Sequence, residues 1–195
     1  MLDCKSISTS IDENLKKLRD YASYSNLIDF TMYLQLIGSL MYRMNTISDI
    51  CFAVNALNQF MCRLRQIHWI AATHVLRYLR GTVGYGLRYD SECDFQLQGF
   101  TDSDWAGCST DRMSTSRCCF NLGSAVISWC SRKQNSVALN TVEVEYMAAS
   151  SATREAVWFP KLLAGLFDQI PEPTVIHCDN QSCVQMLVNP VFHDK

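Results

Sequence analysis

The feature that most constrains the fold of this 195-residue chain is an acidic segment at residues 100–107, with the sequence FTDSDWAG. Residues 95–100 alternate apolar and polar side chains, a pattern typical of a half-buried β-strand. We therefore expect a strand that ends by delivering Asp102 and Asp104 into a turn. A strand end holds a carboxylate rigidly yet exposes it to solvent, which suits coordination of a divalent metal ion, although Asp-Ser-Asp is also ordinary turn chemistry.

The composition is that of a globular protein, with 48% hydrophobic and 18% charged residues. A chain of this length can form one sizeable domain, or a domain with a helical annex. The net charge of −2 gives no general attraction to nucleic acid, so any such binding would depend on local patches. No apolar run is long enough to cross a bilayer, so we expect no membrane insertion. The first twenty residues do not resemble a secretory signal peptide.

The ten cysteines raise the possibility of disulfides or a zinc site. Several of them lie inside apolar or strand-like runs, and no Cys-x-x-Cys pair occurs. We therefore expect reduced cysteines that pack as small hydrophobic side chains.

The first part of the chain is predicted to be helical. Residues 1–29 show no sustained periodicity, and we expect a loosely structured lead-in. From Phe30 onward, apolar residues recur at helical spacing and predict three short helices, the last ending near Gly81, within a helical segment over residues 30–83. Basic residues gather in this region and are candidates for phosphate contacts, although solvated helix faces account for them more simply. They are Arg63, Arg65, Arg77, Arg80 and Arg88.

The pattern changes to strands after Gly84. Residues 84–89 predict a strand ahead of the one that leads to Asp102. Two further strands are predicted at residues 118–122 and 125–129, joined by a hairpin turn at Gly123-Ser124. A polar loop is expected at residues 132–135.

A long helix is then predicted to start at Thr141, the candidate N-cap, and Pro160 is expected to kink or split it. Glu145 lies on the apolar face of this helix. A buried acid must be paired or metal-bound, whereas an acid at the rim reaches water, and the spacing leaves both possibilities open. The other residues on this face are Ala149, Ala152, Ala156, Phe159, Leu163 and Leu166.

A third acid, Asp179, follows the last predicted strand, residues 173–178. Residues 181–188 would form a helix that Pro190 stops. In an open α/β sheet, ligands bind at the carboxyl ends of strands. We therefore expect Asp102, Glu145 and Asp179 to converge in a domain with the element order βββαβα.

Five segments of the chain form a distinctive set: YLQLIGSLMY at residues 33–42, DSDWAG at 102–107, ISW at 127–129, EVEYMAA at 143–149 and CDNQS at 178–182. Together they resemble the copia-type retrotransposon polyprotein, in the tail of its reverse transcriptase followed by its ribonuclease H domain. The resemblance implies an α/β, ribonuclease H-like mixed sheet over residues 84–195, preceded by the small helical segment.

The resemblance also implies a function. Asp102, Glu145 and Asp179 would be the catalytic residues and the ligands of Mg²⁺ or Mn²⁺. Two ions would activate a water and stabilise the leaving oxygen while the RNA strand of an RNA/DNA hybrid is cut, inside the cell. Glu145 is preferred over Glu143 because it matches the family's Glu-hydrophobe-x-Ala segment and lies on the apolar face.

Departures from the family weaken this expectation of catalysis. The family continues into a segment that supplies a fourth metal-site residue, so we expect a C-terminally truncated site with weak or no activity unless His193 or Asp194 substitutes. Arg117 replaces a turn glycine and Val142 replaces a small polar residue.

An alternative of a different class rests on a short motif. Arg77-Tyr78-Leu79-Arg80 matches the Arg-x-Leu-Arg pattern of secreted oomycete effectors, and the chain resembles copia-like sequences filed under that class. Such proteins are secreted, enter plant cells and act on host proteins to suppress defence or cell death, without catalysis. Against this, the motif lies in a predicted helix, the copia family has a similar basic-Tyr-Leu-basic run, and no Glu-Glu-Arg element follows.

Overall fold

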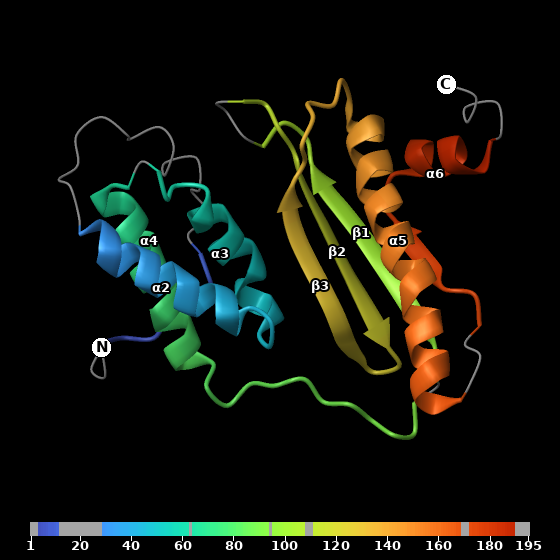
Figure 1. Cartoon of the computed structure of the whole chain (residues 1–195), viewed down its shortest axis with the longest axis horizontal. Helices are drawn as coiled ribbons and strands as arrows, with labels where there is room; N and C mark the ends of the chain where they lie inside the picture. The colour runs from blue at the N-terminus through green and yellow to red at the C-terminus, as the bar shows by residue number, and fades with distance from the viewer. Residues whose placement is uncertain are drawn as a thin grey trace. The chain divides into compact units, whose positions relative to one another are not determined.

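The computed structural model describes residues 4–11, 29–62, 64–93, 95–107, 111–168 and 172–189. It divides the chain into two compact units, Met1–Gly86 and Leu87–Lys195, each drawn in Figure 1. Most of the predicted lead-in lies outside the described residues, as do Arg63, Pro190, His193 and Asp194. None of the helices in the described part of the chain combines the length and the hydrophobicity that a membrane span requires.

The first unit contains the three helices that the periodicity predicted. They are α2 (Phe30–Arg43), α3 (Cys51–Asn58), which follows the short 3₁₀ helix η1 (Ser48–Ile50), and α4 (Gln66–Gly81). The Asp29 side chain caps α2 by accepting a hydrogen bond from the Thr31 N–H at 2.9 Å. Apolar side chains from the three helices form one core, and the buried Tyr33 hydroxyl donates to the Leu57 carbonyl at 3.0 Å.

The second unit is a mixed α/β domain built on a four-stranded sheet, which confirms the predicted α/β class. Its elements are β1 (Leu97–Asp104), β2 (Thr115–Leu122), β3 (Ala125–Lys133), α5 (Thr141–Phe167), β4 (Val175–Cys178) and α6 (Gln181–Val188). The strand order is β3-β2-β1-β4, with β1 antiparallel to β2, β2 antiparallel to β3, and β4 parallel to β1. From β1 onward, the chain order βββαβα is the one that the sequence predicted.

The hairpin between β2 and β3 turns at Gly123-Ser124, as predicted, with Gly123 in the left-handed region at φ 58°. Its ladder shifts by one residue between Asn121, which pairs with Val126, and Phe120, which pairs with Ser128. This β-bulge gives β3 one extra residue. It therefore determines which residue of β3 pairs with each residue of β2 on the side of the bulge away from the turn.

Helix α5 packs on the sheet through the apolar face that the sequence predicted. The core consists of Leu97, Phe120, Ala152, Ala156, Phe159 and Leu163, with Cys118, Leu122, Ile127 and Ile176 packed against it. Gly99 is required in β1, because a Cβ there would lie 2.7 Å from the Phe120 ring. Leu166, which was predicted to join this face, is 65% exposed.

Pro160 does not split α5, so that part of the prediction is wrong. A proline at this position cannot donate to the carbonyl of Ala156 one turn earlier. The Thr174 hydroxyl donates to that carbonyl instead, in a long hydrogen bond of 3.5 Å. A side chain just before β4 thus partly replaces the bond that the helix loses.

Three other expectations about element ends are wrong. Residues 84–89 form no strand in the described chain, because they find no partner strand and expose Tyr85, Leu87 and Tyr89. Strand β3 runs to Lys133, so the loop predicted from residue 132 begins later. The N-cap of α5 is Asn140, whose side chain accepts from the Glu143 N–H at 2.9 Å, and Thr141 is the first helical residue.

Candidate metal centre

Glu145 is the most buried of the three predicted acids, with 6% of its surface exposed. It lies in the first turns of α5, where its Oε1 accepts a hydrogen bond from the Ser103 N–H of β1 at 3.2 Å. Its other oxygen, Oε2, is buried and has no hydrogen-bond partner among the described residues. The acid that the spacing left undecided is therefore buried, and one of its oxygens is unsatisfied.

The pKa of Glu145 is raised above its ordinary value, chiefly because burial disfavours the charged carboxylate. The negative charges of Asp179 and Asp102 raise it further, while hydrogen bonds from Ser103 act in the opposite direction. A positive charge at Oε2 would offset both effects that raise this pKa, namely the burial of the carboxylate and its repulsion by the two other acids.

Asp179 lies beside Glu145. It directly follows β4, which pairs in parallel with β1, and the next residue, Asn180, caps α6 by accepting from the Cys183 N–H at 2.9 Å. One ligand atom from each of Glu145, Cys178 and Asp179 lies within 4.8 Å of the others. Of the three groups, Asp179 is exposed, Cys178 is half-buried and Glu145 is buried.

Cys178 was not predicted as a site residue. The sequence places it directly before Asp179 in the CDNQS segment, which was the only signal for it. A cysteine near a strand end is ordinarily interpreted as packing, and its place beside Glu145 depends on the docking of α5 against the sheet.

Asp102 has a different neighbour. The sequence predicted it in a turn, but β1 continues to Asp104, so Asp102 lies within the strand and faces Arg117 of β2. Arg117 Nη1 lies 2.8 Å from Asp102 Oδ2, with the two side chains 37% and 54% exposed. The structure thus brings Glu145 and Asp179 together, whereas Asp102 forms an ion pair and is not among the three closely spaced ligand groups.

The pleat of β1 explains this separation. Leu97, Gly99 and Thr101 are buried, while the alternate residues Phe100 and Asp102 are exposed. Leu97 packs against α5, so the side chain of Asp102, which alternates with that of Leu97 along β1, belongs to the other face of the sheet. It remains close enough for its charge to act on Glu145.

The donor set fits a divalent cation. Carboxylate oxygens are the preferred ligands of Mg²⁺ and Mn²⁺, and a bound ion would satisfy the buried Oε2 of Glu145. The Cys178 sulfur adds a softer donor that zinc and cadmium prefer over magnesium.

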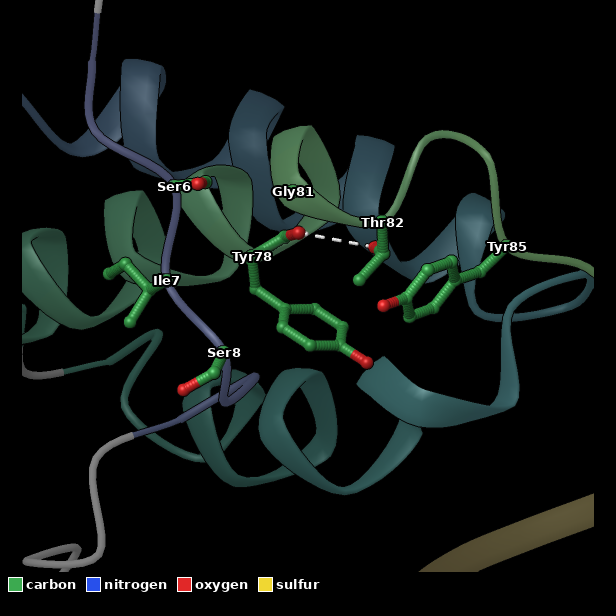
Figure 2. A pocket seen from close by; sticks show the side chains of 7 residues that line it. All are labelled: Ser6, Ile7, Ser8, Tyr78, Gly81, Thr82 and Tyr85. Atoms are coloured by element: carbon green, nitrogen blue, oxygen red, sulfur yellow. Dashed lines mark hydrogen bonds between the residues drawn. The ribbon is translucent and has the colours of Figure 1, made fainter.

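The first unit contains a pocket of about 520 Å³ (Figure 2). Its lining is made of hydroxyl and apolar groups without an acid or a histidine: Ser6, Ile7, Ser8, Tyr78, Gly81, Thr82 and Tyr85. The Thr82 hydroxyl donates to the Tyr78 carbonyl at 3.1 Å, as Figure 2 shows. These groups offer hydroxyl donors and acceptors but no carboxylate or imidazole.

The Arg-Tyr-Leu-Arg motif lies in α4, as predicted. Tyr78 is 9% exposed and its hydroxyl donates to Asp49 Oδ2 at 2.9 Å, and burial together with that carboxylate raises the pKa of Tyr78 to about 12. Arg77 Nε donates to the Lys5 carbonyl at 2.8 Å. The motif is therefore part of a packed helix whose first arginine contacts the N-terminal segment.

No family model matches the chain. The chain is 36% identical over its whole length to the Retrovirus-related Pol polyprotein from transposon RE2 of Arabidopsis thaliana, and it covers 13% of that protein. It is 38% identical, over 83% of its length, to the Retrovirus-related Pol polyprotein from transposon TNT 1-94 of Nicotiana tabacum, and it covers 12% of that protein. It is also 46% identical over 127 residues, 65% of the chain, to the Secreted RxLR effector protein 161 of Plasmopara viticola, of which it covers 89%.

Proposed function

We propose, from the similarity of the chain to retrovirus-related Pol polyproteins of transposons, that its second unit is a ribonuclease H-like domain that hydrolyses the RNA strand of an RNA/DNA hybrid with divalent metal ions. The chain spans only 13% and 12% of two of these polyproteins, so the proposal concerns this segment alone. The helical segment over residues 30–83 would correspond to the tail of the reverse transcriptase.

The observation that carries the proposal is the buried Oε2 of Glu145 beside Asp179 and Cys178. A buried polar atom without a partner costs about 1–3 kcal/mol, and more if it is charged. A fold would not be expected to retain such an atom next to a second carboxylate unless a ligand compensates it. A divalent cation is the ligand whose charge and coordination chemistry match this pair.

The residues of the chain have separable roles in this proposal. Glu145 and Asp179 would hold the ion, while Asp102, in the opposite series of β1 side chains, would add the negative charge that already acts on Glu145. When bound, divalent ions supply activation of a water and stabilisation of the leaving oxygen during phosphodiester hydrolysis. The Ser103 N–H fixes the orientation of Glu145, and capping of α6 by Asn180 fixes the backbone that carries Asp179.

The test of this proposal measures metal binding before activity. Titration of Mn²⁺ into the purified chain, followed by calorimetry, should show binding that Glu145→Gln and Asp179→Asn each weaken at least about tenfold. The matched control is Glu143→Gln on the same helix turn, whose carboxylate accepts from the Leu139 N–H and should leave Mn²⁺ affinity unchanged. Cleavage of a labelled RNA/DNA hybrid is then measured with the same variants.

Two results would contradict the proposal. If Mn²⁺ affinity is the same in wild type and in both site variants, the three groups are not a metal centre. If Mn²⁺ binds as expected but hybrid cleavage is equal in wild type and Asp179→Asn, the centre is not the hydrolytic site.

A second candidate function is supported by one comparison. The similarity to the Secreted RxLR effector protein 161 covers 89% of that protein, far more than the share of the Pol polyproteins that the chain covers. In this alternative the chain would be secreted, enter plant cells and act on host proteins without catalysis. The metal-site carboxylates would then be dispensable, which separates the two candidates experimentally.

A further inference from the structure

Two cysteines face each other across the hairpin. Cys118 of β2 and Cys130 of β3 are direct register partners, and their thiols share a hydrogen bond. The β-bulge creates this pairing, because counting back from the turn without the extra residue would place Cys118 opposite Trp129. Both cysteines are free thiols with partly exposed side chains.

The backbone geometry of such a pair is compatible with a disulfide. Directly opposed residues in antiparallel strands have Cα atoms about 4.5 or 5.5 Å apart, depending on the type of pair. Disulfides accept Cα separations of about 4.4–6.8 Å. Either type of pair therefore permits the bond to close without separating the strands.

We propose that Cys118 and Cys130 form a reactive dithiol, a modification site that small organic disulfides of the glutathione type convert to an intramolecular disulfide.

The surroundings of the pair assign different roles to the two thiols. The hydrogen bond from Cys118 and the positive charge of Arg132 lower the pKa of Cys130 to about 7, against the opposing effects of burial and Glu155. The pKa of Cys118 is raised by the same hydrogen bond, by burial and by the charge of Glu155. Cys130 is therefore the attacking thiolate, and Cys118 is the resolving thiol.

The reaction balances with the small disulfide as the oxidant. The Cys130 thiolate attacks one sulfur of that disulfide, its S–S bond breaks, and one small thiolate leaves. Cys118 then loses its proton to solvent and attacks the Cys130 sulfur of the mixed disulfide, which releases the second small thiolate. Two protein thiols are oxidised by two electrons, and the small disulfide is reduced to two thiols.

Other cysteines in the described chain do not share these properties. Cys119 pairs with Trp129, and the alternation along β2 directs it to the opposite face from Cys118. Cys183 contacts Cys178, but it is fully buried and its pKa is raised to about 12, so it is a poor nucleophile.

The proposal can be tested by peptide mapping of the full chain. Trypsin cleavage after Arg117 and Arg132 releases residues 118–132 as one peptide with three cysteines, so the experiment uses a Cys119→Ser background that leaves two. After incubation with glutathione disulfide and alkylation of the remaining thiols, this peptide should carry no alkyl group and should lack two hydrogens. Dithiothreitol should restore both alkylation sites.

Cys118→Ser, in the same background, provides the matched control. Without the resolving thiol, Cys130 should accumulate as a stable mixed disulfide with glutathione. The exposed Cys62 and Cys93 report that the oxidant is active. The proposal is overturned if the 118–132 peptide keeps both thiols while Cys62 and Cys93 are glutathionylated, or if Cys118→Ser leaves Cys130 unmodified under those conditions.

Discussion

Arg117 Nη1 on β2 lies 2.8 Å from Asp102 Oδ2 on the neighbouring strand, β1. The pleat of β1 keeps Asp102, the first predicted metal ligand, apart from the close group formed by Glu145, Cys178 and Asp179, and this ion pair partly neutralises its charge. Because both side chains are partly exposed, the pair contributes little to stability and can open at low cost. Arg117 therefore weakens the negative potential that Asp102 contributes at Glu145.

The first prediction follows from this neutralisation of Asp102 by Arg117. Arg117→Gln should raise the affinity for Mn²⁺ by about three- to tenfold, because it frees Asp102 and removes a nearby positive charge. The free energy of unfolding should change by less than about 1 kcal/mol. Calorimetric titration measures the affinity, and Arg132→Gln on the neighbouring strand controls for the loss of positive charge alone. Unchanged or weaker Mn²⁺ binding in Arg117→Gln would show that Asp102 takes no part in the site.

The second prediction concerns pH and Glu145. Its pKa is raised above the ordinary 4.5, so the folded state binds this proton more tightly than the unfolded state does. The corresponding stability is fully present below about pH 4.5 and is lost as pH rises through the raised pKa. Glu145→Gln does not titrate, keeps an acceptor for the Ser103 N–H and gains an amide donor beside Asp179.

Urea unfolding at two pH values tests this expectation. Without metal, Glu145→Gln should be more stable than wild type by about 1–2 kcal/mol at pH 7, and the two should converge at pH 4. Glu143→Gln should show no such pH-dependent difference. A loss of stability in Glu145→Gln at pH 7 would mean that the carboxylate charge has a favourable partner.

The third prediction tests the sulfur donor. Cys178→Ser should weaken Cd²⁺ binding about tenfold but Mn²⁺ binding less than about threefold, because cadmium prefers thiolate and manganese prefers oxygen. The ultraviolet charge-transfer absorption of a cadmium–thiolate bond should disappear in this variant. Cys93→Ser, which changes an exposed thiol outside the metal centre, should affect neither ion. Equal Cd²⁺ absorption in wild type and Cys178→Ser would exclude Cys178 as a ligand.

The fourth prediction separates the two candidate functions. If the chain acts as an effector, the double variant Asp102→Asn with Asp179→Asn should leave suppression of plant cell death intact after expression inside leaf cells. Replacing an acid in an empty site removes like-charge repulsion and should not unfold the protein. Loss of suppression by a variant that remains folded by circular dichroism would assign the effect to the metal centre. Absence of suppression by wild type would remove the effector candidate.

Much of the fold follows from local signals in the sequence. Helical spacing located α2, α3 and α4, and the Gly123-Ser124 turn located the hairpin, because these features depend on residues close in sequence. The strand predicted at residues 84–89 failed for the complementary reason. Its alternation is correct, but a strand also requires a partner backbone, and the residues near it in sequence do not show whether one exists.

Less of the candidate site than of the fold could be predicted from the sequence. Asp179 could be placed after β4 from its local pattern, and Glu145 on the apolar face of α5. The ion pair of Asp102 could not be foreseen, because it depends on β2 pairing with β1 as far as Asp104. The place of Cys178 beside Glu145 likewise depends on how a helix docks on a sheet.

The β-bulge between β2 and β3 has a consequence for motion as well as for pairing. A slip of the ladder by one residue would smooth out the bulge, set Cys118 against Trp129, and move Cys130 to the other face of the sheet. A closed Cys118–Cys130 bond is incompatible with that slipped ladder. Oxidation would therefore lock the hairpin in one register, and amide hydrogen exchange around Phe120 and Ile127 would slow without any change in the average structure.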